Sequence, residues 1–559
     1  MLTEKSRKTF DLVIVGSGTG LAAALAAHER GLEVLVIEKT DLIGGSTARS
    51  GGAFWIPANE ILEARGAGDT VERADRYLET LVGETSTPAK LRKYVRSGND
   101  TVRMLHRMTR MKFTWAQGYS DYHPEVSGGS AAGRSCECRP FDAARLGPHR
   151  ADLRPSVMSA PVPMAVTGGD YKWLNLMVKI PVRGLAVAAW RAIQGVGGLL
   201  IGRRYVAGGQ ALAAGLYDGV LRANIPVWRN TELLEVHRNE DGVSGILVRR
   251  DGQEQEIDAR AGVVLAAGGF DHDLVWRQRH QSKHLEDWSL GSSGNTGDAI
   301  KAGIAVGGST ALLDQSWWFP AFAPLAGRAP TVMFPSWLVH DRSARAPVHQ
   351  RSGGLHVVRP THPAPGTHRR SSRHDVDGLR PGIPQQLPPR RERFPHMPLP
   401  KAWYEQGIAV NATSWKALAR KMGVDETSFS DEAARFAEAA TAGVDEQFMR
   451  GQSAYDRYYG DPTISPNPNL RALDPRRLYA VKIVLSDLGT CGGLRTDERS
   501  RVLDAEGNAI DGLYAIGNTA ANLFGTRYPG AGGTIGPGLV GGYVAADDAA
   551  ERARRIERG

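Results

Sequence analysis

The strongest constraint on the fold lies near the start of the chain, at residues 11–38, DLVIVGSGTGLAAALAAHERGLEVLVIE. An apolar, β-branched run leads into three glycines at alternate positions, and a segment of helical composition separates these from a second apolar run that ends on Glu38. This order predicts a strand, a glycine-rich turn, a helix and a second strand, which is the βαβ unit of a doubly wound α/β sheet.

Each part of this unit suits a dinucleotide. Gly16 can form the tight turn, Gly18 lets a diphosphate approach the backbone, and the helix that follows presents unpaired N–H groups to that diphosphate. Glu38 lies about 22 residues after Gly16, near the ~20 expected for a carboxylate that binds a ribose diol. Because Leu21 stands where a small residue is usual, close packing of the helix must depend on Gly20 and Ala22.

Composition limits the class of protein. A chain of 559 residues should hold more than one domain, and 42% hydrophobic with 23% charged residues is typical of a globular protein. Cys136, Cys138 and Cys491 form no disulfide framework and lack the spacing of a zinc site, so we expect free thiols, no metal and a cytoplasmic location. The first ten residues contain no apolar leader core.

Further glycine-rich elements follow. Residues 39–57 form a loop of small and hydroxyl residues that could approach a flat ring or a phosphate. We expect a helix at 208–221, strands at 226–238 and 242–249, and a strand at 261–271 that returns beside the first one.

A second domain is predicted from residue 286 to the turn-rich segment 461–469, DPTISPNPN. Its DQSWWFP cluster at 314–320 could line an apolar cavity. Beyond it, we expect a strand at 479–485. Near the end, Tyr528 precedes a glycine turn and Thr534 opens a helix, whose N-terminus could stabilise negative charge on a bound ring.

These motifs resemble the FAD-dependent 3-ketosteroid dehydrogenases of the fumarate reductase/succinate dehydrogenase flavoprotein superfamily. The resemblance rests on GSGTG at 16–20, GGSTARSGGAFWIP at 44–57, SDYHPE at 120–125, LAAGGF at 265–270, GLYAIGN at 512–518 and YPGAGGTIGP at 528–537. It implies an α/β fold with a Rossmann-like FAD-binding domain built from both chain ends (1–285 and 470–559) and an inserted α+β substrate domain (286–469).

The resemblance also implies chemistry, namely removal of hydrogen from C1 and C2 of a 3-ketosteroid A ring, with hydride passing to the flavin. Tyr528 and the N–H of Gly532 would bind the C3 carbonyl oxygen, and Tyr122 would support the base. The electron acceptor is not indicated. Contacts with FAD are expected from Gly16, Gly18, Gly20, Glu38, Lys39, Gly45, Ser46, Thr47, Ser50, Gly51, Gly52, Ala267, Gly268, Gly517, Asn518, Gly533, Thr534 and Ile535.

Residues 338–395 depart from the family pattern. The family has a tyrosine in its substrate domain that acts as the base, but this segment contains no tyrosine. It holds eleven arginines, no lysine and four acids, which is +7 of the net charge of +9. A basic nucleic-acid arm, a histidine-rich metal tract and a disordered loop are possible interpretations.

We favour a fourth interpretation, that this segment is translated out of frame. Synonymous codons for 347–358 can read RFINEAAAYMSF in the shifted frame, and those for 376–392 can read WMVFDQAFRNNYLHAAS. Both resemble the family, and the shifted tyrosine would stand across codon 355, where this chain has Leu355. The charge is then no evidence for a nucleic-acid partner.

Several alternatives stay open on sequence alone. The chain could act at another A-ring position, could reduce a small dicarboxylate as fumarate reductases do, or could bind FAD and steroid without turnover. GTCGG at 489–493 lacks the histidine of the fumarate reductase motif. Residues 173–201 are apolar but contain Lys179, Arg183 and Arg191, which predicts two helices with at most peripheral membrane contact.

Overall fold

The βαβ unit predicted at residues 11–38 forms the centre of an eight-stranded sheet in this computed structural model. The structure describes residues 8–157, 163–177, 179–325, 331–332, 375–379 and 399–558. β1 (Lys8–Val15) pairs in parallel with β2 (Val34–Ile37) on one side and with β11 (Gln253–Leu265) on the other, and α1 (Gly20–Glu29) connects β1 to β2. The predicted strand, turn, helix and strand are confirmed.

Strands from the N-terminal and the C-terminal parts of the chain complete this sheet. β20 (Ala509–Ala515) pairs in parallel with β11 and carries β19 (Arg501–Leu503) at the edge, while β8 (Val227–Trp228) extends the other side beyond β2. β9 (Thr231–Asn239) and β10 (Gly242–Arg250) form a hairpin that joins β11. The strand predicted at 226–238 is divided, because Asn230 adopts a left-handed turn conformation with φ of 51°.

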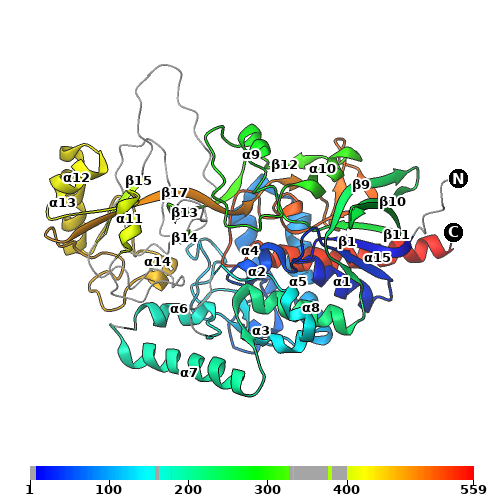
Figure 1. The fold of residues 1–559 in the computed structure, drawn as a ribbon, viewed down its shortest axis with the longest axis horizontal. Coiled ribbons are helices and arrows are strands. Elements are labelled where there is room, and N and C mark those ends of the chain that lie inside the picture. Colours follow the sequence, from blue (N-terminus) through cyan, green and yellow to red (C-terminus); the bar gives the residue numbers. More distant parts are fainter. Residues whose placement is uncertain are drawn as a thin grey trace.

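Helices with small residues on their inner faces cover the sheet. α1 is buried from Gly20 to Ala27 and packs against α15 (Ile535–Arg558), where a Cβ on Gly542 would lie 3.0 Å from the Ala23 Cβ. α8 (Gly208–Arg222) packs beside α1. Figure 1 shows α1, α8 and α15 gathered around the sheet near the C-terminus.

Further helices and strands surround this core. They are α2 (Gly45–Arg49), β3 (Ala53–Trp55), α3 (Glu60–Glu63), α4 (Val71–Val82), α5 (Pro88–Met108), β4 (Phe113–Trp115), β5 (Ser135–Cys138), β6 (Phe141–Asp142), β7 (Tyr205–Val206), α9 (Leu274–His280), α10 (Asp298–Ala305), β12 (Thr310–Ala311) and β18 (Gly493–Leu494).

A second, antiparallel sheet lies at the other end of the molecule (Figure 1). Its long strand is β17 (Leu478–Thr490), which pairs with β13 (Ser316–Phe322), β15 (Asp375–Leu379) and β16 (Ala409–Ala412), and β13 also pairs with β14 (Thr331–Val332). The nearby helices are α11 (Lys401–Glu405), α12 (Trp415–Met422), α13 (Glu426–Ala442) and α14 (Ala454–Tyr459). β17 begins after the predicted boundary at 469 yet pairs with strands of this sheet; the boundaries at 285 and 469 stay predictions.

Two segments singled out in the sequence, 338–395 and 173–201, are described to different extents in the structure. In the anomalous segment 338–395 the structure describes only the backbone of β15, and position 355 lies outside the described residues. Of the two helices predicted at 173–201, α7 (Pro181–Leu200) lies within that range, whereas α6 (Gly168–Asn175) begins before it and overlaps it only at 173–175. Within the described residues, no helix combines the length and apolar character needed to cross a membrane.

Candidate active site

A cavity of about 400 Å³ opens at the carboxyl ends of β1, β2 and β11. In open α/β sheets this edge is where ligands bind. Its wall contains most of the residues predicted to contact the cofactor: Gly16, Gly18, Glu38, Lys39, Gly45, Ser46, Thr47, Ser50, Gly51, Gly52, Ala267, Gly268, Gly517, Asn518, Thr534 and Ile535.

Gly20 and Gly533, also predicted to contact the cofactor, do not line the cavity. A Cβ on Gly20 would lie 3.0 Å from Ile14 Cγ2, so this glycine lets α1 pack closely on the sheet. A Cβ on Gly533 would lie 3.3 Å from Cε1 of Tyr528, so Gly533 lies against that ring. Neither glycine contacts the cavity directly; Gly20 allows close packing of α1, and Gly533 allows close packing of the Tyr528 ring.

The turn after β1 requires glycine. Gly16 has φ of 112°, and a Cβ there would lie 2.3 Å from the carbonyl oxygen of Ala266. An L side chain would be strained by that dihedral and would also collide with the neighbouring strand end. The tight turn predicted from the sequence is therefore present, and both the dihedral and the close contact explain why it needs glycine at position 16.

Glu38 is held firmly at the end of β2. One carboxylate oxygen accepts hydrogen bonds from Ser17 N (3.2 Å) and Ser17 Oγ (2.5 Å), and the other from Thr40 N (3.0 Å) and Thr40 Oγ1 (2.8 Å). Lys39 instead forms an ion pair with Asp298, with 2.6 Å between Nζ and Oδ2. The acid therefore presents a fixed negative charge beside the glycine turn.

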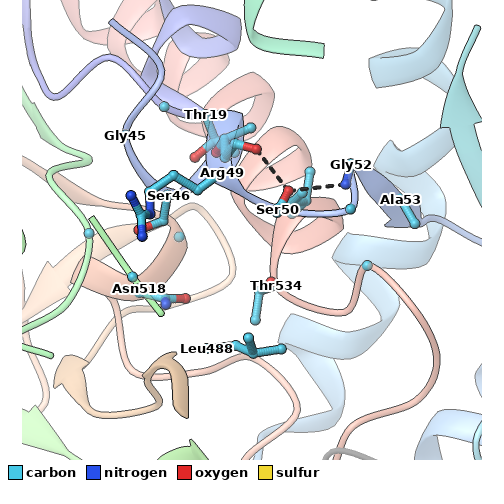
Figure 2. Close-up of a pocket in the computed structure, with 18 of the residues that line it drawn as sticks. Thr19, Gly45, Ser46, Arg49, Ser50, Gly52, Ala53, Leu488, Asn518 and Thr534 are labelled. Atoms are coloured by element: carbon cyan, nitrogen blue, oxygen red, sulfur yellow. Dashed lines mark hydrogen bonds between the residues drawn. The ribbon is translucent and has the colours of Figure 1, made fainter. Parts of the chain in front are cut away.

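The segment from α2 to the start of β3, residues 45–53, leaves room for a ligand. Gly45 and Gly51 line the cavity, and a Cβ on either one would meet no protein atom within 4 Å. Ser50 fixes this segment, since its hydroxyl donates to Thr47 O (2.7 Å) and accepts from Gly52 N (3.1 Å). In Figure 2 this segment faces Asn518 and Thr534 across the pocket. The walls of this space therefore consist of small residues and backbone, and the space suits a flat ring or a phosphate.

Tyr528 stands at the aromatic end of the same cavity. Its side chain is 6% exposed. Burial raises the pKa of Tyr528 to about 12, although the nearby Thr534 side chain and the polar backbone of Gly532, Gly533 and Thr534 oppose this rise. The phenol is therefore neutral at physiological pH and can act as a hydrogen-bond donor to a ligand.

Tyr122 lies directly beside Tyr528. The Tyr122 N–H donates to Pro529 O at 3.0 Å, and the centroids of the two tyrosine rings lie 5.4 Å apart with planes inclined by 24°. Trp317 packs edge-on against Tyr528 at 4.8 Å. Tyr122, Tyr528 and Gly532, predicted as catalytic, all line the cavity, and the prediction that 314–320 lines an apolar cavity is confirmed for Trp317 and Phe319.

Five further tyrosines of this wall were not predicted from the sequence: Tyr119, Tyr171, Tyr455, Tyr458 and Tyr459. The Tyr459 hydroxyl donates to that of Tyr119, which lies 3.4 Å from the Tyr122 hydroxyl. Burial, reinforced by neighbouring tyrosines, raises the pKa of Tyr119, Tyr122, Tyr455 and Tyr459 well above its ordinary value. The run AYDRYYGD at 454–461 was a compositional signal, but no local pattern indicates which loop it meets.

Comparison with known proteins identifies the family. Residues 11–535 match the FAD binding domain family. The 3-oxosteroid 1-dehydrogenase of Mycolicibacterium smegmatis is 38% identical, over 98% of this chain and 99% of that protein. The chain belongs to the 3-oxosteroid 1-dehydrogenase family. The resemblance inferred from the motifs and the predicted α/β class with an FAD-binding domain are confirmed.

Solved structures agree with this family. The 3-ketosteroid delta1-dehydrogenase from Sterolibacterium denitrificans, solved in complex with 1,4-androstadiene-3,17-dione, has a TM-score of 0.84 and 30% identity, over 97% of this chain and all of that one. A flavocytochrome c3 fumarate reductase has a TM-score of 0.60, over 98% of this chain and 79% of that one; at 16% identity it shares the fold alone.

FAD is the cofactor of the 3-oxosteroid 1-dehydrogenase family, and the cavity fits it. The glycine turn and α1 N-terminus suit the diphosphate, Glu38 suits the ribose, and the open space beside Gly45 and Gly51 accepts a planar group. No cluster in the described part of the chain gathers three His, Cys, Asp or Glu side chains that could hold a metal ion.

A buried ion network anchors the loop that carries Tyr122. Asp121 accepts hydrogen bonds from Trp55 Nε1 (2.9 Å) and Ser130 N (3.0 Å), and it pairs with Arg134, whose Nε also donates to Asp69 at 2.8 Å. The side chains of Asp121 and Arg134 are fully buried. Because Asp121 precedes Tyr122 directly, this network positions Tyr122 beside Tyr528.

Proposed function

We propose that this member of the 3-oxosteroid 1-dehydrogenase family oxidises the A ring of a 3-ketosteroid and introduces a C1–C2 double bond. The observation that carries the proposal is the meeting of the Tyr528 hydroxyl and the Gly532 turn in a cavity that also contains the glycine turn after β1. Bound FAD supplies the hydride acceptor for this chemistry.

Tyr528 and Gly532 would activate the substrate. The Tyr528 O–H and the Gly532 N–H donate hydrogen bonds to the C3 carbonyl oxygen, which stabilises enolate charge and makes the C2 proton more acidic. The turn leads into α15, whose N-terminus adds a favourable dipole. A phenol with a pKa of about 12 keeps its proton and remains a donor throughout this step.

Tyr122 would assist removal of the C2 proton. Its raised pKa leaves almost no phenolate at neutral pH, so Tyr122 cannot act as the base alone, while the hydroxyls of Tyr119 and Tyr459 extend a hydrogen-bonded path away from it. The family's second tyrosine corresponds to codon 355, where this chain has Leu355. We therefore propose that FAD and steroid bind, and that turnover is slow until the frame across 338–395 is restored.

The three cysteines indicate the cellular compartment of the enzyme. Cys136, Cys138 and Cys491 are free and buried, which agrees with a reducing compartment, and we propose that the protein acts in the cytoplasm.

Sequencing the gene across codons 335–396 tests the reading frame directly. A single-nucleotide shift that restores the tyrosine is expected, and a confirmed frame would contradict this part of the proposal.

Anaerobic addition of a 3-keto-4-ene steroid to the FAD-loaded protein tests the function. We expect the visible absorbance of oxidised flavin to bleach slowly, because the steroid delivers hydride but the tyrosine expected across codon 355 is missing. Steroid binding without bleaching would indicate a binding protein without turnover. Bleaching only by an added reductant, followed by reoxidation with fumarate, would indicate the dicarboxylate chemistry instead.

A further inference from the structure

Lys172, on α6, lies in the wall of the candidate active-site cavity. The residue is half-buried, and its ammonium nitrogen lies 4.9 Å from the ring centroid of Tyr458 and 5.6 Å from that of Trp173. Figure 1 shows α6 next to α14, the helix that carries Tyr458. A positive charge is therefore held at the cavity beside two aromatic rings.

The other charged side chains of this wall each have a polar partner. They are Glu38, Lys39, Arg49, Glu137 and Asp298. The ammonium group of Lys172, by contrast, makes no hydrogen bond and no ion pair within the described part of the chain. Lys172 is thus a charged group of the cavity wall that is available to a ligand.

Partial burial of this unpaired cation costs free energy. Burial lowers the pKa of Lys172, and the positive charge of Arg183 lowers it further. Arg183 is exposed, and its guanidinium lies 3.6 Å from the Trp173 ring centroid. A ligand anion beside Lys172 would offset both effects, because an opposite charge favours the protonated amine.

A row of aromatic rings connects Lys172 to Tyr528. The Tyr458 ring stacks on Tyr119 with 4.6 Å between the centroids, and Tyr119 lies 6.4 Å from Tyr122. Tyr122 in turn lies 5.4 Å from Tyr528, and all of these residues line the same cavity. Lys172 therefore stands at the end of this row opposite to the proposed donor to the C3 carbonyl. A steroid nucleus carries its C17 side chain at the end opposite to C3, so that side chain would approach Lys172.

We propose that Lys172 binds a carboxylate at the end of the C17 side chain, so that this protein is selective for 3-ketosteroids with an acidic side chain. The inference rests on the proposed function, since it takes the A ring to lie against Tyr528. The carboxylate would accept a charge-assisted hydrogen bond from the ammonium group, in a partly dehydrated site where such a bond is stronger than in water. The rings between Tyr528 and Lys172 suit the apolar nucleus and do not distinguish one side chain from another.

Ligand binding to the full-length, FAD-loaded protein tests this selectivity without turnover. A 3-keto-1,4-diene steroid already has the C1–C2 double bond, so its binding needs no base. Isothermal titration calorimetry compares such a steroid whose C17 side chain ends in a carboxylate with its methyl ester. We expect the wild type to bind the acid about tenfold more tightly than the ester, or more. Added salt should weaken binding of the acid and leave that of the ester unchanged.

Three variants assign the selectivity to one side chain. Lys172→Met removes the charge and keeps a long apolar chain, so the acid and the ester should bind about equally. Lys172→Arg keeps the charge and should retain most of the preference. The control is Lys416→Met, on α12, which removes an exposed charge outside the cavity wall and should behave as the wild type. Unchanged flavin absorbance would show that each variant is folded.

Two results would overturn the selectivity while leaving the proposed function intact. One is equal affinity of the wild type for the acid and the ester. The other is a preference for the acid that persists in Lys172→Met. If the wild type bound neither steroid, the proposed function would fail as well, which separates the two failures.

Discussion

At the scale of single residues, two kinds of position define the candidate site. Tyr528 contributes a hydroxyl whose proton is retained, because burial raises its pKa to about 12. Gly51 contributes the absence of a side chain, since nothing lies within 4 Å of the place where a Cβ would be. Substitution at each position separates catalysis from cofactor binding.

Removal of the Tyr528 hydroxyl should impair the chemical step. In Tyr528→Phe one of the two donors that we propose for the C3 carbonyl is lost, and we expect turnover to fall by about 10²-fold or more. FAD should remain bound. The rate of anaerobic flavin bleaching measures the effect, and Tyr543→Phe, whose ring packs under Arg30 at 4.3 Å outside the cavity wall, is the matched control. A normal rate in Tyr528→Phe would remove this residue from the proposed role.

Filling the space beside Gly51 should weaken cofactor binding. In Gly51→Val the new side chain enters the cavity without meeting protein atoms, so the FAD-free protein should unfold at the same temperature. The affinity for FAD should fall about tenfold or more, which corresponds to ~1.4 kcal/mol. Gly197→Val, on α7, also meets no atom within 4 Å and serves as the control. Equal FAD affinity of wild type and Gly51→Val would show that this space is not the cofactor site.

At the scale of elements, the local units were predictable and their long-range partners were not. The glycine turn and α1 were predicted correctly, because dihedral preference and hydrophobic periodicity depend on residues that are close together in the sequence. The contact of α14 with the loop around Tyr119 joins residues separated by 340 positions along the chain, so no local signal could give it. Likewise, β17 reads as a strand in the sequence, while its pairing with β13 depends on tertiary packing.

The Asp121 network should hold the Tyr122 loop. In Asp121→Ala, Arg134 keeps Asp69 but loses a fully buried partner, and we expect the free energy of unfolding to fall by about 3–5 kcal/mol. Chemical denaturation measures the change. The control is Asp100→Ala, which removes an exposed pair with Arg103 at 3.9 Å and should cost less than about 1 kcal/mol. Similar losses in the two variants would show that the buried network does not stabilise the loop.

At the scale of the whole molecule, one sheet combines strands from both ends of the chain. The cavity lies between this sheet and a tyrosine cluster that consists of Tyr119, Tyr122, Tyr455, Tyr458, Tyr459 and Tyr528. The family motifs predicted the sheet and its cofactor. They could not predict the cluster, which needs α14 and the 119–122 loop to meet. The out-of-frame interpretation of 338–395 stays a prediction, since all of that segment except β15 lies outside the described residues.

The tyrosine cluster predicts a distinct response to alkali. An unfolded tyrosine loses its proton near pH 10, whereas burial raises the folded pKa of Tyr458 and Tyr528 to about 12 and raises the pKa of the other four well above its ordinary value. The stability conferred by the neutral phenols is therefore complete below about pH 10 and is lost progressively as the pH rises toward 12. Each tyrosine should contribute a loss of about 1.4 kcal/mol per pH unit.

Spectrophotometric titration measures this response. Eleven of the fifteen tyrosines have pKa values raised by burial, the six of the cluster among them, and these eleven should form tyrosinate only when the protein unfolds. Urea denaturation should become easier over the same pH range. Full ionisation of all fifteen near pH 10 with the fold intact would contradict the burial of the cluster.

The most direct test of the proposed function is to follow the hydrogens that leave the substrate. A 3-keto-4-ene steroid carrying deuterium at C1 and C2 is added without oxygen to the FAD-loaded protein, and the steroid is analysed by mass spectrometry after the flavin bleaches. The account predicts a product with a C1–C2 double bond that has lost label from both carbons. A product that keeps both labels, or that has lost hydrogen from another part of the A ring, would contradict it.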